Sequence, residues 1–182
     1  MPALSLDLRE IAIAMLLSDA CMYKISKHPL IKFEQGYLQE EFLFHLFFIF
    51  KSYCFMLEPG KRNTLDGIRK GLTKSFWFKT FSHSSFDDIW NLFYFDCNDK
   101  ALGIKNIKKI QEGLILNYLT DRGLAYWIMG DGSLNKDRKT MILHTQSYTK
   151  TENLILSREL NEKFGFSSEV IKHKKKIFFN KI

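Results

Sequence analysis

Two apolar stretches of the chain, residues 12–20 and 124–132, share one layout. Each is long enough for two helical turns, and in each a small residue stands directly before a single aspartate, Asp19 or Asp131. A helix that is apolar on nearly all sides has to be buried. The pattern therefore predicts two buried helices, each of which carries a carboxylate out of the core at its C-terminal end. If the two helices pack side by side, the two carboxylates meet.

The same layout continues beyond the helices as an internal repeat. Asp131 stands 112 positions after Asp19, and three further pairs of identical residues are separated by 111 positions. These pairs are Gln35 with Gln146, Tyr37 with Tyr148, and Glu41 with Glu152. An offset of this length is too long for a solenoid period, and its near-constancy indicates two copies of one folding unit.

Hydrophobic periodicity predicts an α+β fold made of two pseudo-symmetric repeats. The first repeat is expected over residues 1–96, a linker over 97–119 and a second, incomplete repeat over 120–182. The predicted helices span 6–19, 39–57, 84–94, 120–131 and 149–164. The predicted strands span 21–25, 30–37, 72–81 and 141–147, with a further pair within 169–182. Helix 84–94 has no counterpart in the second copy, which is therefore expected to lack its last helix.

The composition favours a nucleic-acid partner without requiring one. Among 182 residues, 27 are basic and 20 acidic, which gives a net charge of +7. A phosphate backbone is the commonest target of such a surface, although net charge alone does not separate binding from solubility. The high phenylalanine count of 17 is typical of an AT-rich coding sequence. We therefore expect an organelle, a mitochondrion or chloroplast, as the location, with the gene encoded there.

Neither a zinc site nor a membrane anchor is expected. The cysteines Cys21, Cys54 and Cys97 form no Cys-x-x-Cys pair, and their odd number indicates a reducing compartment. No basic region precedes the first apolar run, so a signal peptide is not predicted. The apolar stretch 42–50 is about half of the roughly 20 residues that a membrane-spanning helix needs.

Two carboxylates at adjoining helix ends can hold a hard cation such as Mg²⁺. With phosphate oxygens bound to it, such a centre can hydrolyse a phosphodiester, and a nearby lysine would stabilise the developing charge. A single aspartate at a helix C-terminus is usually only a solvated residue. The repetition of this placement favours function for Asp19 and Asp131, whereas Gln35 and Gln146 are as readily ordinary strand residues as supports of the site.

The sequence resembles the LAGLIDADG homing endonuclease family, in its organellar, two-motif, monomeric type. The resemblance rests on segments 8–11, 32–35, 78–83, 119–120, 124–129 and 144–147. It implies two αββαββα repeats whose motif helices pack at a central interface, with two antiparallel sheets forming a saddle over double-stranded DNA. It also implies a staggered cut in both strands with Mg²⁺, although some relatives act as RNA-splicing maturases.

When the functional residues of the family are matched to this sequence position by position, Asp19 and Asp131 correspond to the metal-binding acids. Gln35 and Gln146 match polar strand positions near the attacking water, and Lys100 matches a basic residue of the site. Family members continue through a final helix and a second basic residue, which this chain lacks, so the chain looks truncated at its C-terminus. That departure leaves a cleavage-impaired RNA-binding relative as the alternative to a DNA endonuclease.

The remaining expectations concern the binding surface and the assembly. Alternating polar side chains on the strands are expected to contact phosphates and base edges in a duplex groove. The basic residues expected on this surface are Lys24, Lys32, Lys74, Lys79, Arg138, Lys139, Lys172, Lys174 and Lys175. We expect double-stranded DNA as the partner, with structured RNA as the alternative. The protein should be a pseudo-dimeric monomer, either complete in itself or completed by another chain.

Overall fold

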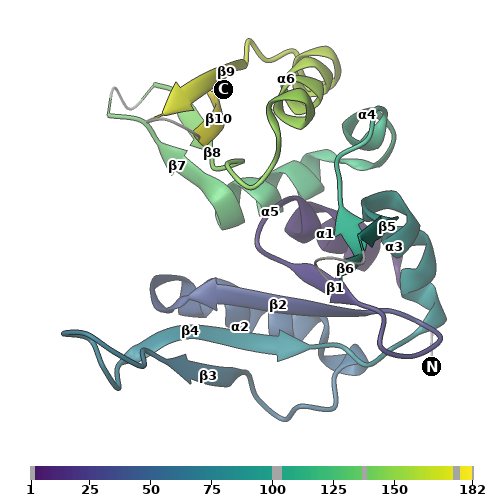
Figure 1. Ribbon diagram of the computed structural model, residues 1–182, viewed down its shortest axis with the longest axis vertical. Coiled ribbons are helices and arrows are strands. Elements are labelled where there is room, and N and C mark those ends of the chain that lie inside the picture. The colour runs from purple at the N-terminus through teal and green to yellow at the C-terminus, as the bar shows by residue number, and fades with distance from the viewer. Residues whose placement is uncertain (1–2, 100–103, 137–138, 174–176, 182) are drawn as a thin grey trace.

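The computed structural model describes residues 3–99, 104–136, 139–173 and 177–181 (Figure 1). Within them, one α-β-β-α-β-β unit occurs twice in succession. The first copy consists of α1 (Leu6–Leu17), β1 (Cys21–Tyr23), β2 (Leu30–Gly36), α2 (Glu40–Ile49), β3 (Gly60–Asn63) and β4 (Thr73–Lys79). The second consists of α5 (Asp121–Asp131), β7 (Gly132–Leu134), β8 (Met141–Leu143), α6 (Lys150–Phe164), β9 (Glu169–His173) and β10 (Ile177–Lys181).

The two sheets have the same strand order, which confirms the two-repeat fold. The first sheet is ordered β1-β2-β4-β3 and the second β7-β8-β10-β9. All neighbouring strands in both sheets are antiparallel. Figure 1 shows the sheets on either side of α1 and α5, so the two helices form the joint between the repeats.

The sequence makes α1 and α5 pack closely. Ser5 caps the start of α1 and Thr120 the start of α5, each by accepting a main-chain N–H bond. The Thr120 hydroxyl also donates to Glu10 Oε2 of α1 at 2.9 Å. Near the other end, a Cβ on Gly130 would lie 3.1 Å from Ser18 Cβ, so the absence of a side chain allows the helices to approach.

Aromatic packing holds the first sheet to its helix. The rings of Phe33 on β2 and Phe78 on β4 stack with centroids 4.6 Å apart, and Phe47 of α2 meets Phe78 edge-on at 5.4 Å. In the second repeat, Leu156 and Leu160 of α6 are fully buried. Each sheet therefore packs one face against a helix, and the first sheet leaves its other face open.

Several predicted boundaries were wrong, while the elements themselves were confirmed. The helix predicted over 39–57 ends at Ile49 and is followed by a 3₁₀ turn, Lys51–Tyr53. The chain leaves the helix because Tyr53 turns into the core, where its ring lies 5.8 Å from that of Phe86. The helix predicted over 84–94 is a 3₁₀ turn, Ser84–Phe86, followed by α3 (Asp87–Phe93).

The segment predicted as a linker contains regular structure. β5 (Tyr94–Asp99) and β6 (Ile104–Lys108) form an antiparallel hairpin, and α4 (Leu114–Tyr118) follows. The carboxylate of Glu159 accepts hydrogen bonds from the main chain of Gly113 and Ile115 at 2.6 and 3.0 Å, which ties α4 to α6. The division into repeats at 1–96 and 120–182 stays a prediction.

None of the helices that the structure describes has both the length and the apolar character to cross a lipid bilayer.

Candidate functional site

Asp19 and Asp131 lie at the same end of the helix pair. Asp19 follows the last residue of α1 by two positions, and Asp131 is the last residue of α5. Burial, together with the neighbouring negative charge of Asp19, raises the pKa of Asp131 to about 7. Burial also raises the pKa of Asp19, although the nearby Lys108 ammonium and Gln35 amide oppose this. The structure therefore brings the two predicted carboxylates together in a partly desolvated setting.

Lys108, at the end of β6, supplies a positive charge beside both carboxylates. Its ammonium donates a hydrogen bond to the main-chain oxygen of Ala20 at 3.2 Å. Burial lowers the pKa of Lys108 to about 8, and the charges of Asp131 and Asp19 act in the opposite direction. Sequence reasoning missed this residue, because nothing in the lysine-rich segment 100–109 singles out one lysine. The predicted basic residue, Lys100, lies outside the described residues.

The two predicted glutamines do not have equivalent places. Gln35 is buried on β2, 3% exposed, and its amide lies close enough to Asp19 to lower the pKa of that carboxyl by hydrogen bonding. Gln146 is exposed in a turn beyond β8, which ends at Leu143, so its predicted strand position was wrong. The buried residue at this point of the second repeat is Thr145, whose hydroxyl bonds to Asn153.

Each repeat holds the acid-bearing helix of the other. Tyr148, which follows β8, donates its hydroxyl to Leu17 O of α1 at 3.0 Å. Gln39, which follows β2, donates its amide to Gly130 O of α5 at 3.4 Å. The last carbonyls of a helix lack partners within the helix, and here the opposite repeat supplies them. Both carboxylates are thus positioned by contacts across the joint.

The donors at this site suit a hard divalent cation. Across the described residues, no group of three His, Cys, Asp or Glu side chains could hold a metal, so protein ligands here would be the two carboxylates. Their mutual repulsion, which adds to burial in raising the pKa of Asp131, would be offset by a cation between them. Carboxylate oxygens are the ligands that Mg²⁺ prefers. The two aspartates fit such an ion, with the remaining positions open to water or phosphate.

Four of the basic residues predicted to bind nucleic acid lie on or beside the first sheet. Lys79 is exposed on β4, with its ammonium 5.6 Å from the Trp77 ring. The ammonium of Lys32 on β2 lies 6.0 Å from the centroid of the same ring. Lys24, just after β1, is exposed. The open face of this sheet therefore combines cations with aromatic rings.

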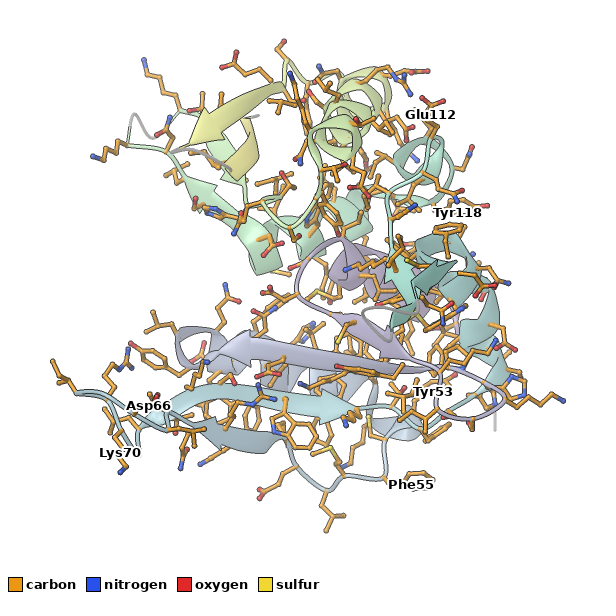
Figure 2. All side chains as sticks on the ribbon, in the orientation of Figure 1. Tyr53, Phe55, Asp66, Lys70, Glu112 and Tyr118 are labelled. Atoms are coloured by element: carbon orange, nitrogen blue, oxygen red, sulfur yellow. The ribbon has the colours of Figure 1, made fainter. Side chains whose placement is uncertain are left out.

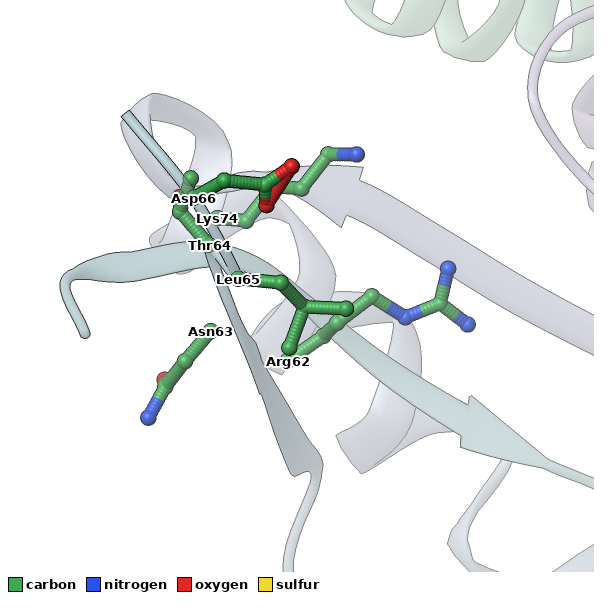
Figure 3. A pocket seen from close by; sticks show the side chains of 6 residues that line it. All are labelled: Arg62, Asn63, Thr64, Leu65, Asp66 and Lys74. Atoms are coloured by element: carbon green, nitrogen blue, oxygen red, sulfur yellow. The ribbon is translucent and has the colours of Figure 1, made fainter. Parts of the chain in front are cut away.

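A hollow lies at the tip of this sheet. It has a volume of about 670 Å³ and is lined by residues of the β3–β4 hairpin, among them Arg62, Asp66 and Lys74 (Figure 3). Figure 2 shows Asp66 and Lys70 at the far end of this hairpin. Arg62 and Lys74 in this hollow continue the basic surface of the first sheet toward its tip.

The other predicted basic residues belong to the second repeat. Lys139 is exposed before β8, and Lys172 is part of β9. Arg138, Lys174 and Lys175 lie outside the described residues. The predicted basic surface is accordingly described mainly for the first sheet.

Comparison with known proteins decides the family. The model of the LAGLIDADG DNA endonuclease family matches residues 9–182. The chain belongs to this family. A solved LAGLIDADG structure, the homing endonuclease I-WcaI bound to its DNA recognition sequence, superposes with a TM-score of 0.82 at 30% identity, covering all of this chain and 77% of that chain. The likeness extends over both repeats.

Two LAGLIDADG relatives have been given different functions. A probable intron-encoded DNA endonuclease 3 from Mycosarcoma maydis is 54% identical over 106 residues, which are 58% of this chain and 74% of that protein. The cytochrome b mRNA maturase bI2 of Saccharomyces cerevisiae is 30% identical over 155 residues, 84% of this chain but 35% of that protein. Family membership is therefore compatible with action on DNA or on RNA.

Proposed function

We propose that this chain is a site-specific endonuclease that makes a staggered cut in both strands of DNA with Mg²⁺. The observation that carries the proposal is the meeting of Asp19 and Asp131 at the end of the α1–α5 pair, with Lys108 beside them. The likeness to a homing endonuclease bound to its DNA recognition sequence supports DNA as the substrate.

Asp19 and Asp131 would hold the metal ion between the two repeats. When bound, Mg²⁺ supplies a Lewis acid that polarises the phosphodiester and favours ionisation of a water nucleophile. Because one carboxylate comes from each repeat, the centre is shared by both halves of the site. This sharing suits a cut in both strands of a duplex that lies across the two sheets.

Lys108 and Gln35 would act on the substrate from within the protein. The Lys108 ammonium, held by Ala20 O, stabilises negative charge that develops on the phosphate in the transition state. The buried Gln35 side chain lies beside Asp19, and its amide lowers the pKa of that carboxyl by hydrogen bonding. From this place the amide would orient the attacking water. The site roles of Lys100 and Gln146 rest on the family resemblance alone, since no contact among the described residues supports them.

The open faces of the two sheets would hold the duplex. Lys24, Lys32, Lys74 and Lys79 can contact phosphates, and contacts of this kind fix the position of a protein on DNA without reading its sequence. For the second repeat we propose Lys139 and Lys172, together with Arg138, Lys174 and Lys175. One chain with two repeats would act as a pseudo-dimeric monomer, or be completed by another chain.

Structured RNA is the second candidate ligand, because the maturase bI2 is similar over 84% of this chain. A cleavage-impaired RNA-binding protein could use the same basic faces without the acidic pair. The relative described as intron-encoded also supports an origin in an organellar intron, with action in a mitochondrion or chloroplast.

The test is selection followed by cleavage. The protein is incubated with a randomised duplex pool in Ca²⁺ to isolate bound sequences, which are then exposed to Mg²⁺ or EDTA. We expect staggered double-strand cuts in Mg²⁺ that are lost in EDTA and in the Asp19→Asn variant, which should still bind. Tight binding to structured RNA without DNA cuts by the wild-type protein would favour the second candidate and overturn the proposal.

A further inference from the structure

The open face of the first sheet carries one acidic residue among its cations. Strand side chains alternate, so residues such as Phe33 and Phe78 point into the core while their neighbours face outward. Glu34 on β2 is outward, directly opposite Trp77 of β4. In β1 to β4, all of whose residues are described, Glu34 is the only aspartate or glutamate.

Donors on three strands hold the Glu34 carboxylate in place. Its Oε1 accepts a hydrogen bond from Ser75 Oγ of β4 at 2.6 Å and lies 3.4 Å from Arg62 of β3. Its Oε2 forms an ion pair with Lys32 on the same strand. Burial would raise the pKa of Glu34, but these partners hold it below its usual value. The carboxylate is therefore ionised at neutral pH and restrained in one orientation.

The Glu34 side chain also remains partly accessible. The side chain is 23% exposed, so part of it is reachable from the open face. Glu34 lies near the acidic pair, because its negative charge is close enough to act on Asp19. A base pair that reaches Glu34 would thus lie near the acidic pair.

A negative charge here is unfavourable for contact with phosphates. Like charges on a surface that binds a polyanion reduce affinity, and such a group can serve discrimination instead. An ionised carboxylate only accepts hydrogen bonds. In the major groove it can accept from the exocyclic amino group of cytosine, whereas the guanine N7 and O6 atoms are acceptors that it repels.

We propose that Glu34 is a specificity-determining residue that reads a cytosine amino group in the major groove. Lys32, Arg62 and Ser75 restrain the carboxylate for this contact. This inference rests on the proposed function, since it requires that the first sheet faces duplex DNA. It differs from a purely organising role, in which Glu34 would only hold Lys32 and Arg62 toward phosphates.

The experiment compares base preferences of Glu34 variants on one randomised duplex pool in Ca²⁺. The wild-type protein should prefer cytosine at one position of the half-site bound by the first repeat. In Glu34→Gln, discrimination at that position should fall at least about fivefold or shift to adenine, which glutamine recognises. Glu34→Asp keeps the charge and should keep a weakened cytosine preference. Glu58→Gln removes an exposed charge from the loop between α2 and β3 and should match the wild type.

The outcomes separate this inference from the proposed function. If Glu34→Gln binds all sequences more weakly but keeps the wild-type base preferences, Glu34 only organises its neighbours and the inference is wrong. If the wild-type protein selects no duplex, both the proposed function and the inference fail. Thermal unfolding of each variant confirms that the compared proteins are folded.

Discussion

The Lys108 ammonium donates a hydrogen bond to the main-chain oxygen of Ala20 at 3.2 Å, one residue beyond the carboxylate of Asp19. This contact joins the β5–β6 hairpin to the end of α1. It holds a cation beside two carboxylates that would otherwise repel each other. The hairpin therefore contributes to the site and does more than connect the repeats.

Replacement of Lys108 by glutamine should slow cleavage more than it weakens binding. The ammonium acts on charge that develops in the transition state, so single-turnover rates at saturating protein should fall by about 100-fold. Lys109→Gln is the matched control, because that neighbouring side chain is exposed. Equal losses in the two variants, or an unchanged rate in Lys108→Gln, would exclude this role.

The acid-bearing helices could be predicted from the sequence because their signal is local. An apolar run ending in one aspartate, present twice, indicates two buried helices with carboxylates at their ends, and Asp19 and Asp131 lie there. Lys108 could not be predicted, since its role depends on where the hairpin docks in three dimensions. Its segment offered several lysines with no pattern to separate them.

Gln146 shows how a constant offset can mislead. Cys21 pairs with Lys32 in the first repeat, whereas Ser133 pairs with Ile142 in the second, so the second hairpin is shorter. The shorter hairpin brings Thr145, and not Gln146, to the buried place that Gln35 has in the first repeat. Gln146 is consequently exposed, although it matches the buried Gln35 by sequence spacing.

In the metal-free protein, ionisation of Asp131 should cost stability as the pH rises from about 4 to 7. Asp131 has a folded-state pKa of about 7, above its unfolded value of 3.8, so folding favours the protonated form and ionisation opposes it. Denaturant unfolding in EDTA measures this effect. The free energy of unfolding of Asp131→Asn, relative to that of the wild type, should rise by about 1–3 kcal/mol between pH 4.5 and 7.5. Parallel pH curves for the two proteins would contradict the buried, repelled carboxylate.

Gly130→Ala should destabilise the joint between the repeats. The new methyl group would clash with Ser18 Oγ and would lie 3.1 Å from Ser18 Cβ and 3.6 Å from Met15 Cε. Such overpacking should cost about 1–3 kcal/mol of unfolding free energy, and Ser18→Gly in the same chain should restore part of it. Gly36→Ala is the control, since no atom lies within 4 Å of its added Cβ. Equal stability of both alanine variants would show that close approach is not required.

Lys79→Gln should weaken binding to all duplexes to a similar degree. An exposed lysine that contacts one phosphate adds about 0.9 to the slope of log affinity against log salt, and its removal should reduce the slope by that amount. Fluorescence anisotropy at several salt concentrations measures the slope. Lys150→Gln, on the helix that covers the second sheet, should leave it unchanged. A salt slope of Lys79→Gln equal to that of the wild type would remove Lys79 from the interface.

The most direct test of the acidic centre is the single-turnover cleavage rate of Asp19→Asn, Asp131→Asn and the double variant in Mg²⁺. If the two carboxylates share one metal centre, each single variant should lose nearly all activity, and the double variant should lose little more. All three should still bind the selected duplex in Ca²⁺ or without metal. Substantial cleavage by either single variant, or losses that multiply in the double variant, would contradict a centre shared by the two repeats.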